Sequence, residues 1–290
     1  MGTRGSALAL RQTQIAIDAM RIAAPSETFE VVEISTKGDV DKQTPFEELG
    51  PKGIFAVELQ RALVTREIDV AVHSLKDLQS FEPEGLVIAA VLERADPRDV
   101  LVSRGGRTLA DLPEGARVGT SSARRDAELR TVRPDLVTAP LRGNVDTRLR
   151  KVADGEVDAA ILAAAGIERL GRADEITECL DPSVFVPPPG QGAIAIEARA
   201  DEVGWLAGAD HAATRRCVDA ERVFMQVIEG SCEVPLGAFA RLDSGDIVLE
   251  AFLGSRSDAR HVRDWERGSH PLEVGTTLAR RVLAKADFAL

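Results

Sequence analysis

Short apolar runs alternate with helical patterns through the first two hundred residues of this 290-residue chain. The runs 86–92 and 159–163 are continuously apolar, which is typical of strands that are buried on both faces. Apolar residues at helical spacing follow in segments such as 145–153. The repetition of strand, loop and helix predicts an α/β fold with mainly parallel, doubly wound sheets that carry helices on both faces.

Two segments are expected to carry the chain from one domain to another. Residues 93–99 are polar and include Pro97, and residues 187–190 read Pro-Pro-Pro-Gly, which is incompatible with a helix or a strand. The block between these two segments is therefore expected to be inserted into the first domain. Residues 210–290 contain a helical stretch, strands at 236–242 and 247–253, and a final helix, which together predict a small α+β domain. The predicted boundaries are 1–92 with 190–209 for domain 1, 93–189 for domain 2 and 210–290 for domain 3.

Composition excludes several classes of protein. The net charge of −11 argues against a nucleic-acid binder, and no apolar run approaches the roughly 18 residues that a membrane span needs. No signal peptide is recognised, so we expect a cytoplasmic protein without nucleic-acid or membrane partners. The three cysteines, Cys179, Cys217 and Cys232, are too few and too widely spaced for a disulfide framework or a Cys-x-x-Cys zinc site, and no metal is expected. Cys179 and Cys217 lie in helical patterns and are interpreted as packing residues.

Basic and hydroxyl residues recur where the predicted strands end. Such ends bind ligands in doubly wound sheets, because they lead into helix N-termini. Backbone N–H groups of small residues can face an anion there, and fixed cations add to the attraction. Ser122 and Asn144 are also interpreted as ordinary helix N-caps, but five similar ends predict a cleft for a ligand with several negative charges. The five segments are 3–6, 35–38, 73–77, 119–125 and 142–148.

One carboxylate stands among these cations. Asp77 follows Lys76 at the end of an apolar strand, where it either forms a salt bridge or, held ionised, stabilises a positive centre on a substrate. His73 has no second histidine at ligand spacing and is interpreted as structural. Residues 190–195 match G-x-G-x-x-A, but they enter a predicted strand rather than a helix, so a dinucleotide site is rejected.

Five segments and one cysteine loop together resemble the porphobilinogen deaminase (hydroxymethylbilane synthase) family. They are Gly2-Thr3-Arg4-Gly5-Ser6-Ala7-Leu8-Ala9-Leu10, Val70-Ala71-Val72-His73-Ser74-Leu75-Lys76-Asp77, Gly119-Thr120-Ser121-Ser122-Ala123-Arg124-Arg125, Leu141-Arg142-Gly143-Asn144-Val145-Asp146-Thr147-Arg148-Leu149, Gly190-Gln191-Gly192-Ala193 and Glu229-Gly230-Ser231-Cys232-Glu233-Val234-Pro235-Leu236-Gly237. The match runs from end to end in family order, so the set is highly specific although each motif alone is modest.

The resemblance implies two hinged domains like type II periplasmic binding proteins, and a third, smaller α+β domain. It implies a transferase of tetrapyrrole (heme) biosynthesis that condenses four porphobilinogen molecules head to tail, releases ammonia, and yields hydroxymethylbilane. It also implies a covalent dipyrromethane cofactor on Cys232, and a monomer whose partner is the small-molecule substrate. The chain has 30 Arg against 6 Lys, for which a GC-rich genome is one explanation. The two carboxylates on each pyrrole ring are a second reason for many arginine forks in an acidic protein.

Site residues are carried over position by position. The resemblance implies that Asp77 is catalytic, stabilising the pyrrole N–H and the positive charge that develops during condensation. It implies that the cofactor is bound by Lys76, Asp77, Phe55, Ser122, Arg124, Arg125 and Arg148. It implies that the incoming ring or growing chain is bound by Arg4, Ser6, Gln12, Arg142, Arg148 and Arg169.

The chain departs from the family pattern at some positions, none of them catalytic. The family usually has proline at Ala7 and Gln79, an aromatic residue at Arg11, and leucine at Ala123. Its members also usually carry several residues before the Gly-Thr-Arg motif, so either a shortened first strand or a truncated chain is expected here.

Two other functions compete with the deaminase. One is a non-enzymatic carboxylate-binding protein on the same two-domain scaffold, which would need neither Asp77 nor Cys232. The other is a thiol enzyme that uses Cys232 directly as its nucleophile.

Overall fold

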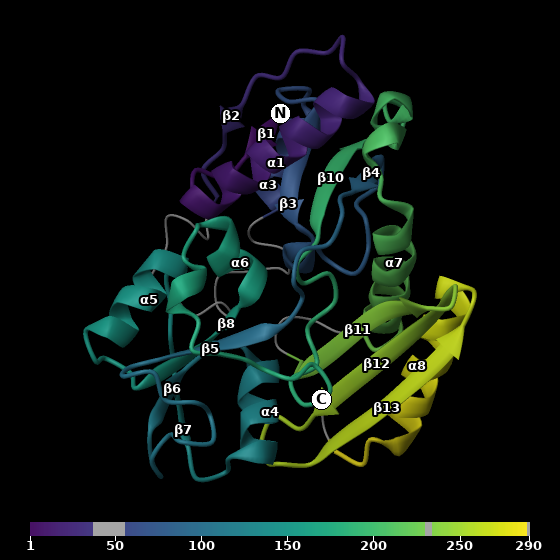
Figure 1. Ribbon diagram of the computed structural model, residues 1–290. Coiled ribbons are helices and arrows are strands. Elements are labelled where there is room, and N and C mark those ends of the chain that lie inside the picture. Colours follow the sequence, from purple (N-terminus) through teal and green to yellow (C-terminus); the bar gives the residue numbers. More distant parts are fainter. Residues whose placement is uncertain (37–55, 230–233, 289–290) are drawn as a thin grey trace. The chain divides into compact units, whose positions relative to one another are not determined.

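The computed structural model describes residues 1–36, 56–229 and 234–288 (Figure 1). The chain divides into two compact units. Unit 1 comprises Met1–Ala95 and Gly192–Arg216, and unit 2 comprises Asp96–Gln191 and Cys217–Leu290. The chain leaves unit 1 after Ala95 and returns to it at Gly192. The division into three domains stays a prediction.

Unit 1 is built on a five-stranded sheet in the order β2-β1-β3-β10-β4. Helix α1 packs on one face, where Ala16, Ile17 and Met20 join Val70 and Val72 in one apolar core. Helix α3 packs on the other face of the sheet. The elements are β1 (Gly2–Thr3), α1 (Ala7–Ala23), β2 (Val32–Glu33), α3 (Val57–Val64), β3 (Val70–Ser74), the 3-10 turn η1 (Leu75–Asp77), β4 (Leu86–Val91), β10 (Ile194–Arg199) and the 3-10 helix η3 (Gly204–Ala209).

Unit 2 contains a second five-stranded sheet, in the order β7-β6-β8-β5-β9. Its two faces carry separate apolar cores, one containing Leu149 of helix α5 and the other Leu129 of helix α4. The helices therefore cover both faces, as the apolar strands predict. The elements are β5 (Asp99–Ser103), β6 (Arg117–Gly119), α4 (Ala123–Val132), β7 (Val137–Ala139), α5 (Val145–Ala153), β8 (Ala159–Ala163), α6 (Ala164–Arg169), η2 (Ala173–Glu175) and β9 (Glu178–Cys179).

Both sheets are mixed, which corrects the expectation of mainly parallel sheets. β1, β2 and β3 are parallel, as are β6, β7 and β8, but β10 and β5 each run antiparallel to both neighbours. These two strands come directly after the segments that contain Pro97 and the 187–190 run. Parallel neighbours are joined by a crossover connection that usually contains a helix. A strand that is reached by another kind of connection can run antiparallel to its neighbours.

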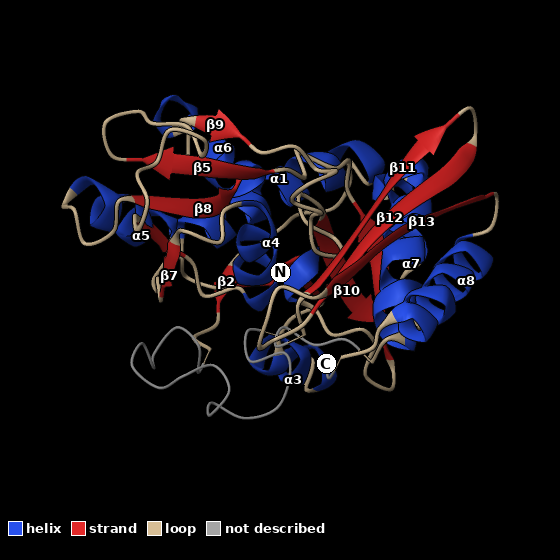
Figure 2. Ribbon diagram, turned by 90° about the horizontal axis from the view of Figure 1, so that it is seen from below, coloured by secondary structure: helices blue, strands red, loops and turns tan. Residues whose placement is uncertain are grey.

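The rest of unit 2 is a three-stranded antiparallel sheet, β11-β12-β13. Helices α7 and α8 cover one face of it (Figure 2), and Phe224 and Leu278 from these helices pack against Leu249. The elements are α7 (Ala212–Val227), β11 (Leu236–Asp243), β12 (Asp246–Gly254), β13 (His261–Gly268) and α8 (Pro271–Lys285). The α+β class of this region agrees with the prediction.

Strand β13 was not expected from the sequence. It reads His-Val-Arg-Asp-Trp-Glu-Arg-Gly, and Val262 is its only buried residue. β13 lies at the edge of the sheet, so charged and aromatic side chains cover most of it and the apolar alternation of a strand is missing.

Cys179 corrects a second expectation. It lies in strand β9 and is exposed, whereas a helical packing position was expected. Cys217 lies in α7 and is buried, as predicted. Residues 194–199 form a strand, which confirms the rejection of a dinucleotide site at 190–195. Within the described residues, none of the helices combines the length and apolar character needed to cross a lipid bilayer.

Candidate active site

In unit 1, the carboxyl ends of β1 and β3 bring predicted site residues together. The two strands are parallel, so their ends meet at the same edge of the sheet. Ser6 caps α1 by accepting a hydrogen bond from the N–H of Ala9 at 3.3 Å. Gln12, further along α1, is buried and donates from Nε2 to Ser74 Oγ at 2.8 Å. The helix cap and the amide therefore fix the start of α1 against the end of β3.

The turn after β3 presents Lys76 and Asp77. The N–H of Leu75 donates to the carbonyl oxygen of Ala193 at 3.0 Å, and the N–H of Leu78 donates to Leu75 at 3.1 Å. These bonds fix the backbone on both sides of Asp77, which is half-buried. Its carboxylate makes no hydrogen bond or ion pair with any residue that the structure describes. Asp77 therefore lies on a fixed backbone, and none of the described residues binds its carboxylate oxygens, which can face a ligand.

His73 belongs to the core of unit 1 and not to the group of predicted ligand-binding residues. Its imidazole is buried, and Nε2 lies 3.0 Å from Oε2 of the buried Glu197. Glu197 also accepts a hydrogen bond from Gln60 of α3 at 2.9 Å. These contacts are what a histidine built into the core of unit 1 would make.

In unit 2, the loops after β6 and β7 lie side by side. Ser121 Oγ donates to the carbonyl oxygen of Leu141 and accepts from its N–H, both at 3.1 Å. Gly119 allows this approach, because a Cβ at that position would lie 2.8 Å from Leu141 Cδ2. Ser122 follows and caps α4, accepting from the N–H of Arg125 at 3.4 Å. The predicted N-cap role of Ser122 is confirmed.

The loop after β7 carries two of the predicted arginines. Asn144 caps α5 by accepting from the N–H of Thr147 at 2.9 Å, which confirms its predicted cap role. Gly143 has a φ of 110°, a conformation that favours glycine. Arg148 Nε donates to the carbonyl oxygen of Gly143 at 2.8 Å, so this guanidinium lies back over the loop that begins at Arg142.

Arg124 and Arg125 are more deeply buried than the sequence suggested, with 3% and 6% of their surface exposed. Both bind Asp99 in β5: Arg124 Nη2 lies 2.7 Å from Oδ2, and Arg125 Nη2 lies 2.7 Å from Oδ1. Gln191 donates to the same Oδ1 at 2.9 Å. Burial alone would raise the pKa of Asp99, but the two guanidinium groups and these hydrogen bonds outweigh it and hold the pKa well below its ordinary range.

Glu128 completes this buried cluster. Its Oε2 accepts from Arg124 Nη1 at 2.6 Å, and its Oε1 accepts from the N–H of Val186 at 2.7 Å. Burial raises the pKa of Glu128 to about 8, against the opposing effect of Arg124. Asp99 and Glu128 were not singled out from the sequence, and Gln191 was named only within the Gly190-Gln191-Gly192-Ala193 motif, with no role given to it. The only signal was the position of Asp99 at the start of an apolar strand, and that position was assigned to a polar crossing segment.

Arg169 ends helix α6 and is partly buried. Burial lowers its pKa to about 10, with a smaller opposing effect from Glu168, so the group is still a cation at neutral pH. Cys232 and Phe55 lie outside the residues that the structure describes, as do Lys37 and Gly38 of the second basic segment.

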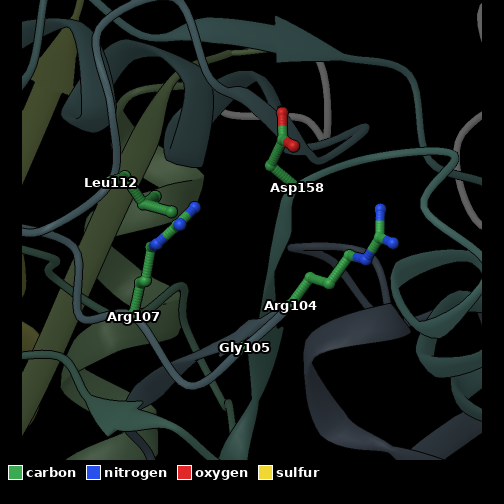
Figure 3. A pocket seen from close by; sticks show the side chains of 5 residues that line it. All are labelled: Arg104, Gly105, Arg107, Leu112 and Asp158. Atoms are coloured by element: carbon green, nitrogen blue, oxygen red, sulfur yellow. The ribbon is translucent and has the colours of Figure 1, made fainter.

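A separate pocket of about 310 Å³ occurs in unit 2 (Figure 3). It lies where the last residue of β5 pairs with the first residue of β8. That edge is opposite to the carboxyl ends of β6 and β8, which carry Ser122 and the other predicted residues. The pocket is therefore distinct from the candidate site. It is lined by Arg104, Gly105, Arg107, Leu112 and Asp158.

Comparison with known proteins agrees with the motifs. Residues 1–206 match the family model "Porphobilinogen deaminase, dipyromethane cofactor binding domain", and residues 215–284 match "Porphobilinogen deaminase, C-terminal domain". The chain belongs to the porphobilinogen deaminase family. The porphobilinogen deaminase of Roseiflexus sp. (strain RS-1) is 48% identical over 295 residues, covering 100% of this chain and 97% of that protein. The porphobilinogen deaminase of Brevibacillus brevis is 45% identical over 289 residues, covering 98% of this chain and 94% of that protein.

Among solved structures, the chain is similar to the Bordetella pertussis BvgS VFT2 domain. The TM-score is 0.41 at 20% identity, over 68% of this chain and 76% of that one. A periplasmic binding protein of Salmonella typhimurium with high arginine specificity gives a TM-score of 0.36 at 13% identity, over 68% and 80%.

Proposed function

We propose that this chain performs the reaction of its family, in which four porphobilinogen molecules condense head to tail to hydroxymethylbilane with release of ammonia. Family membership over the whole length of the chain is the observation that carries the proposal. The site chemistry supports it, because cations and hydroxyl groups follow the strand ends of both units, while one carboxylate, Asp77, has no hydrogen-bond or ion-pair partner among the described residues. A protein that only captured carboxylates would gain nothing from that carboxylate.

The residues present fit a dipyrromethane cofactor bound to Cys232. Its acetate and propionate groups need fixed cations, and the buried, hydrogen-bonded Arg124 and Arg125 supply them on α4. Ser122, Lys76 and Arg148 would complete its binding, with Phe55 as an aromatic neighbour. When bound, the cofactor supplies a primer whose terminal pyrrole carbon takes up the next ring.

Asp77 has the role of an electrostatic catalyst in this proposal. Condensation places positive charge on the pyrrole that is attacked, and a preorganised carboxylate stabilises that charge and its N–H. The turn at Leu75–Asp77 holds the carboxylate in place before substrate arrives, so little reorganisation is needed.

Substrate carboxylates are proposed to bind Arg4, Ser6, Gln12, Arg142, Arg148 and Arg169. Arg169 is suited to this task because its partial burial strengthens its attraction to an anion. The proposal also includes a cytoplasmic monomer.

The test is the intact mass of the purified protein under denaturing conditions. We expect an excess equal to two condensed pyrrole units, and we expect that excess to be absent from a Cys232→Ala variant that is still folded. Protein with the bare sequence mass should gain the same excess after incubation with porphobilinogen. If it gains none, the proposed function is wrong.

A further inference from the structure

Four hydrogen bonds from three residues hold the Asp99 carboxylate inside the protein. Oδ1 accepts from Arg125 Nε at 3.2 Å, from Arg125 Nη2 at 2.7 Å and from Gln191 Nε2 at 2.9 Å, while Oδ2 accepts from Arg124 Nη2 at 2.7 Å. A carboxylate has about four acceptor positions, and the side chain is fully buried. The Asp99 carboxylate is therefore engaged by donors of the protein itself and is not exposed to a substrate.

The two arginines occupy an electrostatically unfavourable position. Arg124 and Arg125 are the second and third residues of α4, where the helix dipole and the unpaired N–H groups favour an anion over a cation. Burial adds to the cost, because a buried ion pair is often no more stabilising than apolar side chains of similar volume. Stability alone does not account for two buried arginines at this helix terminus.

Each arginine has N–H groups for which the described residues supply no acceptor. Arg125 uses Nε and one N–H of Nη2 on Asp99, and one N–H of Nη1 on the carbonyl oxygen of Ile161 at 2.9 Å. A guanidinium has five N–H groups, so two remain on Arg125. Arg124 uses three N–H groups, which donate to Asp99, to Glu128 and to the carbonyl oxygen of Val186. Its Nε is buried and has no acceptor among the described residues. A buried donor without an acceptor is costly, and is typical of a site that a ligand completes.

The bonds to Asp99 determine which N–H groups of Arg124 and Arg125 remain available. A guanidinium is planar, so fixing some of its N–H groups fixes the direction of the others. Among the described residues Asp99 is the only carboxylate bound to Arg125, whereas Arg124 also binds Glu128. Without Asp99, Arg125 would be a buried cation that lacks a counter-ion and a fixed orientation.

We infer that Asp99 is a positioning residue, whose carboxylate orients Arg124 and Arg125 and leaves their remaining N–H groups to hold a carboxylate of the pyrrole cofactor. Gln191 assists by fixing Asp99 Oδ1, and it donates from the same Nε2 to the carbonyl oxygen of Pro97 at 2.7 Å. This inference rests on the proposed function and adds residues that touch neither cofactor nor substrate.

The test compares Asp99→Asn with Glu221→Gln as a matched control. Glu221 is also a fully buried carboxylate of unit 2, but its two oxygens accept from the N–H groups of Gly190 at 2.8 Å and Ala240 at 2.7 Å. Both substitutions replace a buried carboxylate by an amide of the same shape, so both should lower the melting temperature. Only Asp99→Asn should lower the fraction of protein that carries the two-pyrrole mass, by about tenfold or more. Glu221→Gln should stay within about twofold of the unsubstituted protein on this measure.

Gln191→Met covers the case in which Asp99→Asn does not fold. It removes one donor to Asp99 and leaves every charge in place, and we expect an intermediate loss of the two-pyrrole mass. A loaded fraction that is unchanged in Gln191→Met, or equal in Asp99→Asn and Glu221→Gln, would overturn the positioning role alone. Failure of the unsubstituted protein to acquire the mass from porphobilinogen would overturn the proposed function, and this inference with it.

Discussion

Ser121 Oγ lies 3.1 Å from both the backbone nitrogen and the carbonyl oxygen of Leu141. One hydroxyl thus closes a two-way hydrogen bond between the loop after β6 and the loop after β7. The first loop leads to Ser122 and the second to Arg142, so this pair of bonds sets the spacing of two predicted binding residues.

Ser121→Ala should loosen the two loops while leaving the core intact. Loss of both bonds, with the backbone groups of Leu141 left to find other partners, should lower the free energy of unfolding by about 1–3 kcal/mol. KM for porphobilinogen should rise more than kcat falls. Urea unfolding and steady-state kinetics would measure these effects, with Ser257→Ala as the control because Ser257 is exposed and bonds only locally to Ser255. Equal effects of the two substitutions would contradict the prediction.

Gly119→Ala should be more damaging than its single added methyl group suggests. The new Cβ would lie 2.8 Å from Leu141 Cδ2 and 3.1 Å from Leu141 Cβ, and Leu141 is fully buried and cannot move aside. Overpacking of this kind costs about 1–3 kcal/mol, which thermal unfolding would detect. Gly204→Ala is the matched control, because no atom lies within 4 Å of a Cβ placed there. The explanation fails if both substitutions shift the melting temperature equally.

Asp77→Asn should separate cofactor binding from turnover. The carboxylate makes no hydrogen bond or ion pair with the described residues, so its loss should leave folding and the two-pyrrole mass unchanged. Loss of the charge that stabilises the cationic step should lower kcat by about a hundredfold or more. Intact mass and initial rates measure the two effects. Asp201→Asn serves as a control, since Asp201 is an exposed residue of unit 1 in a 3.8 Å ion pair with Arg66. Near-normal turnover by Asp77→Asn would remove Asp77 from the mechanism.

Acid should destabilise the protein partly through Asp99. Its pKa in the folded protein lies below the ordinary value of 3.8, so the folded state binds a proton less readily than the unfolded state does. Its contribution to stability is therefore complete above about pH 5 and is lost as the pH falls through 3.8 and below. Asp99→Asn should be less stable than the unsubstituted protein at pH 6, and the difference should shrink as the pH drops from 4 to 2. Urea unfolding across this range would measure it, and a constant difference would contradict the assignment.

The sequence was most informative where the local pattern and the tertiary role agree. Residues 145–153 form the predicted helix and residues 159–163 the predicted strand, because each has a strong apolar period and a buried face. Ser122 and Asn144 were recognisable as caps because a cap is a local arrangement of three or four residues.

Features that depend on distant partners were not visible in the sequence. Asp99 meets Arg125 across 26 positions of sequence, and nothing near Asp99 marks it as a counter-ion. β13 is stabilised by pairing with β12 rather than by its own apolar residues, and the direction of β10 depends on the crossing segment before it. In each case the deciding interaction is made in the folded chain and leaves no local pattern.

Glu221 couples two segments of unit 2 that are distant in sequence. Its two carboxylate oxygens accept the N–H of Gly190, at the end of the proline-rich segment, and the N–H of Ala240 in β11. If either amide opened to solvent alone, the buried carboxylate would lose one of these two hydrogen bonds, which is costly in a dry interior. The two amides, fifty positions apart in sequence, should therefore exchange their hydrogens with solvent water at a common rate, as members of one cooperative opening unit.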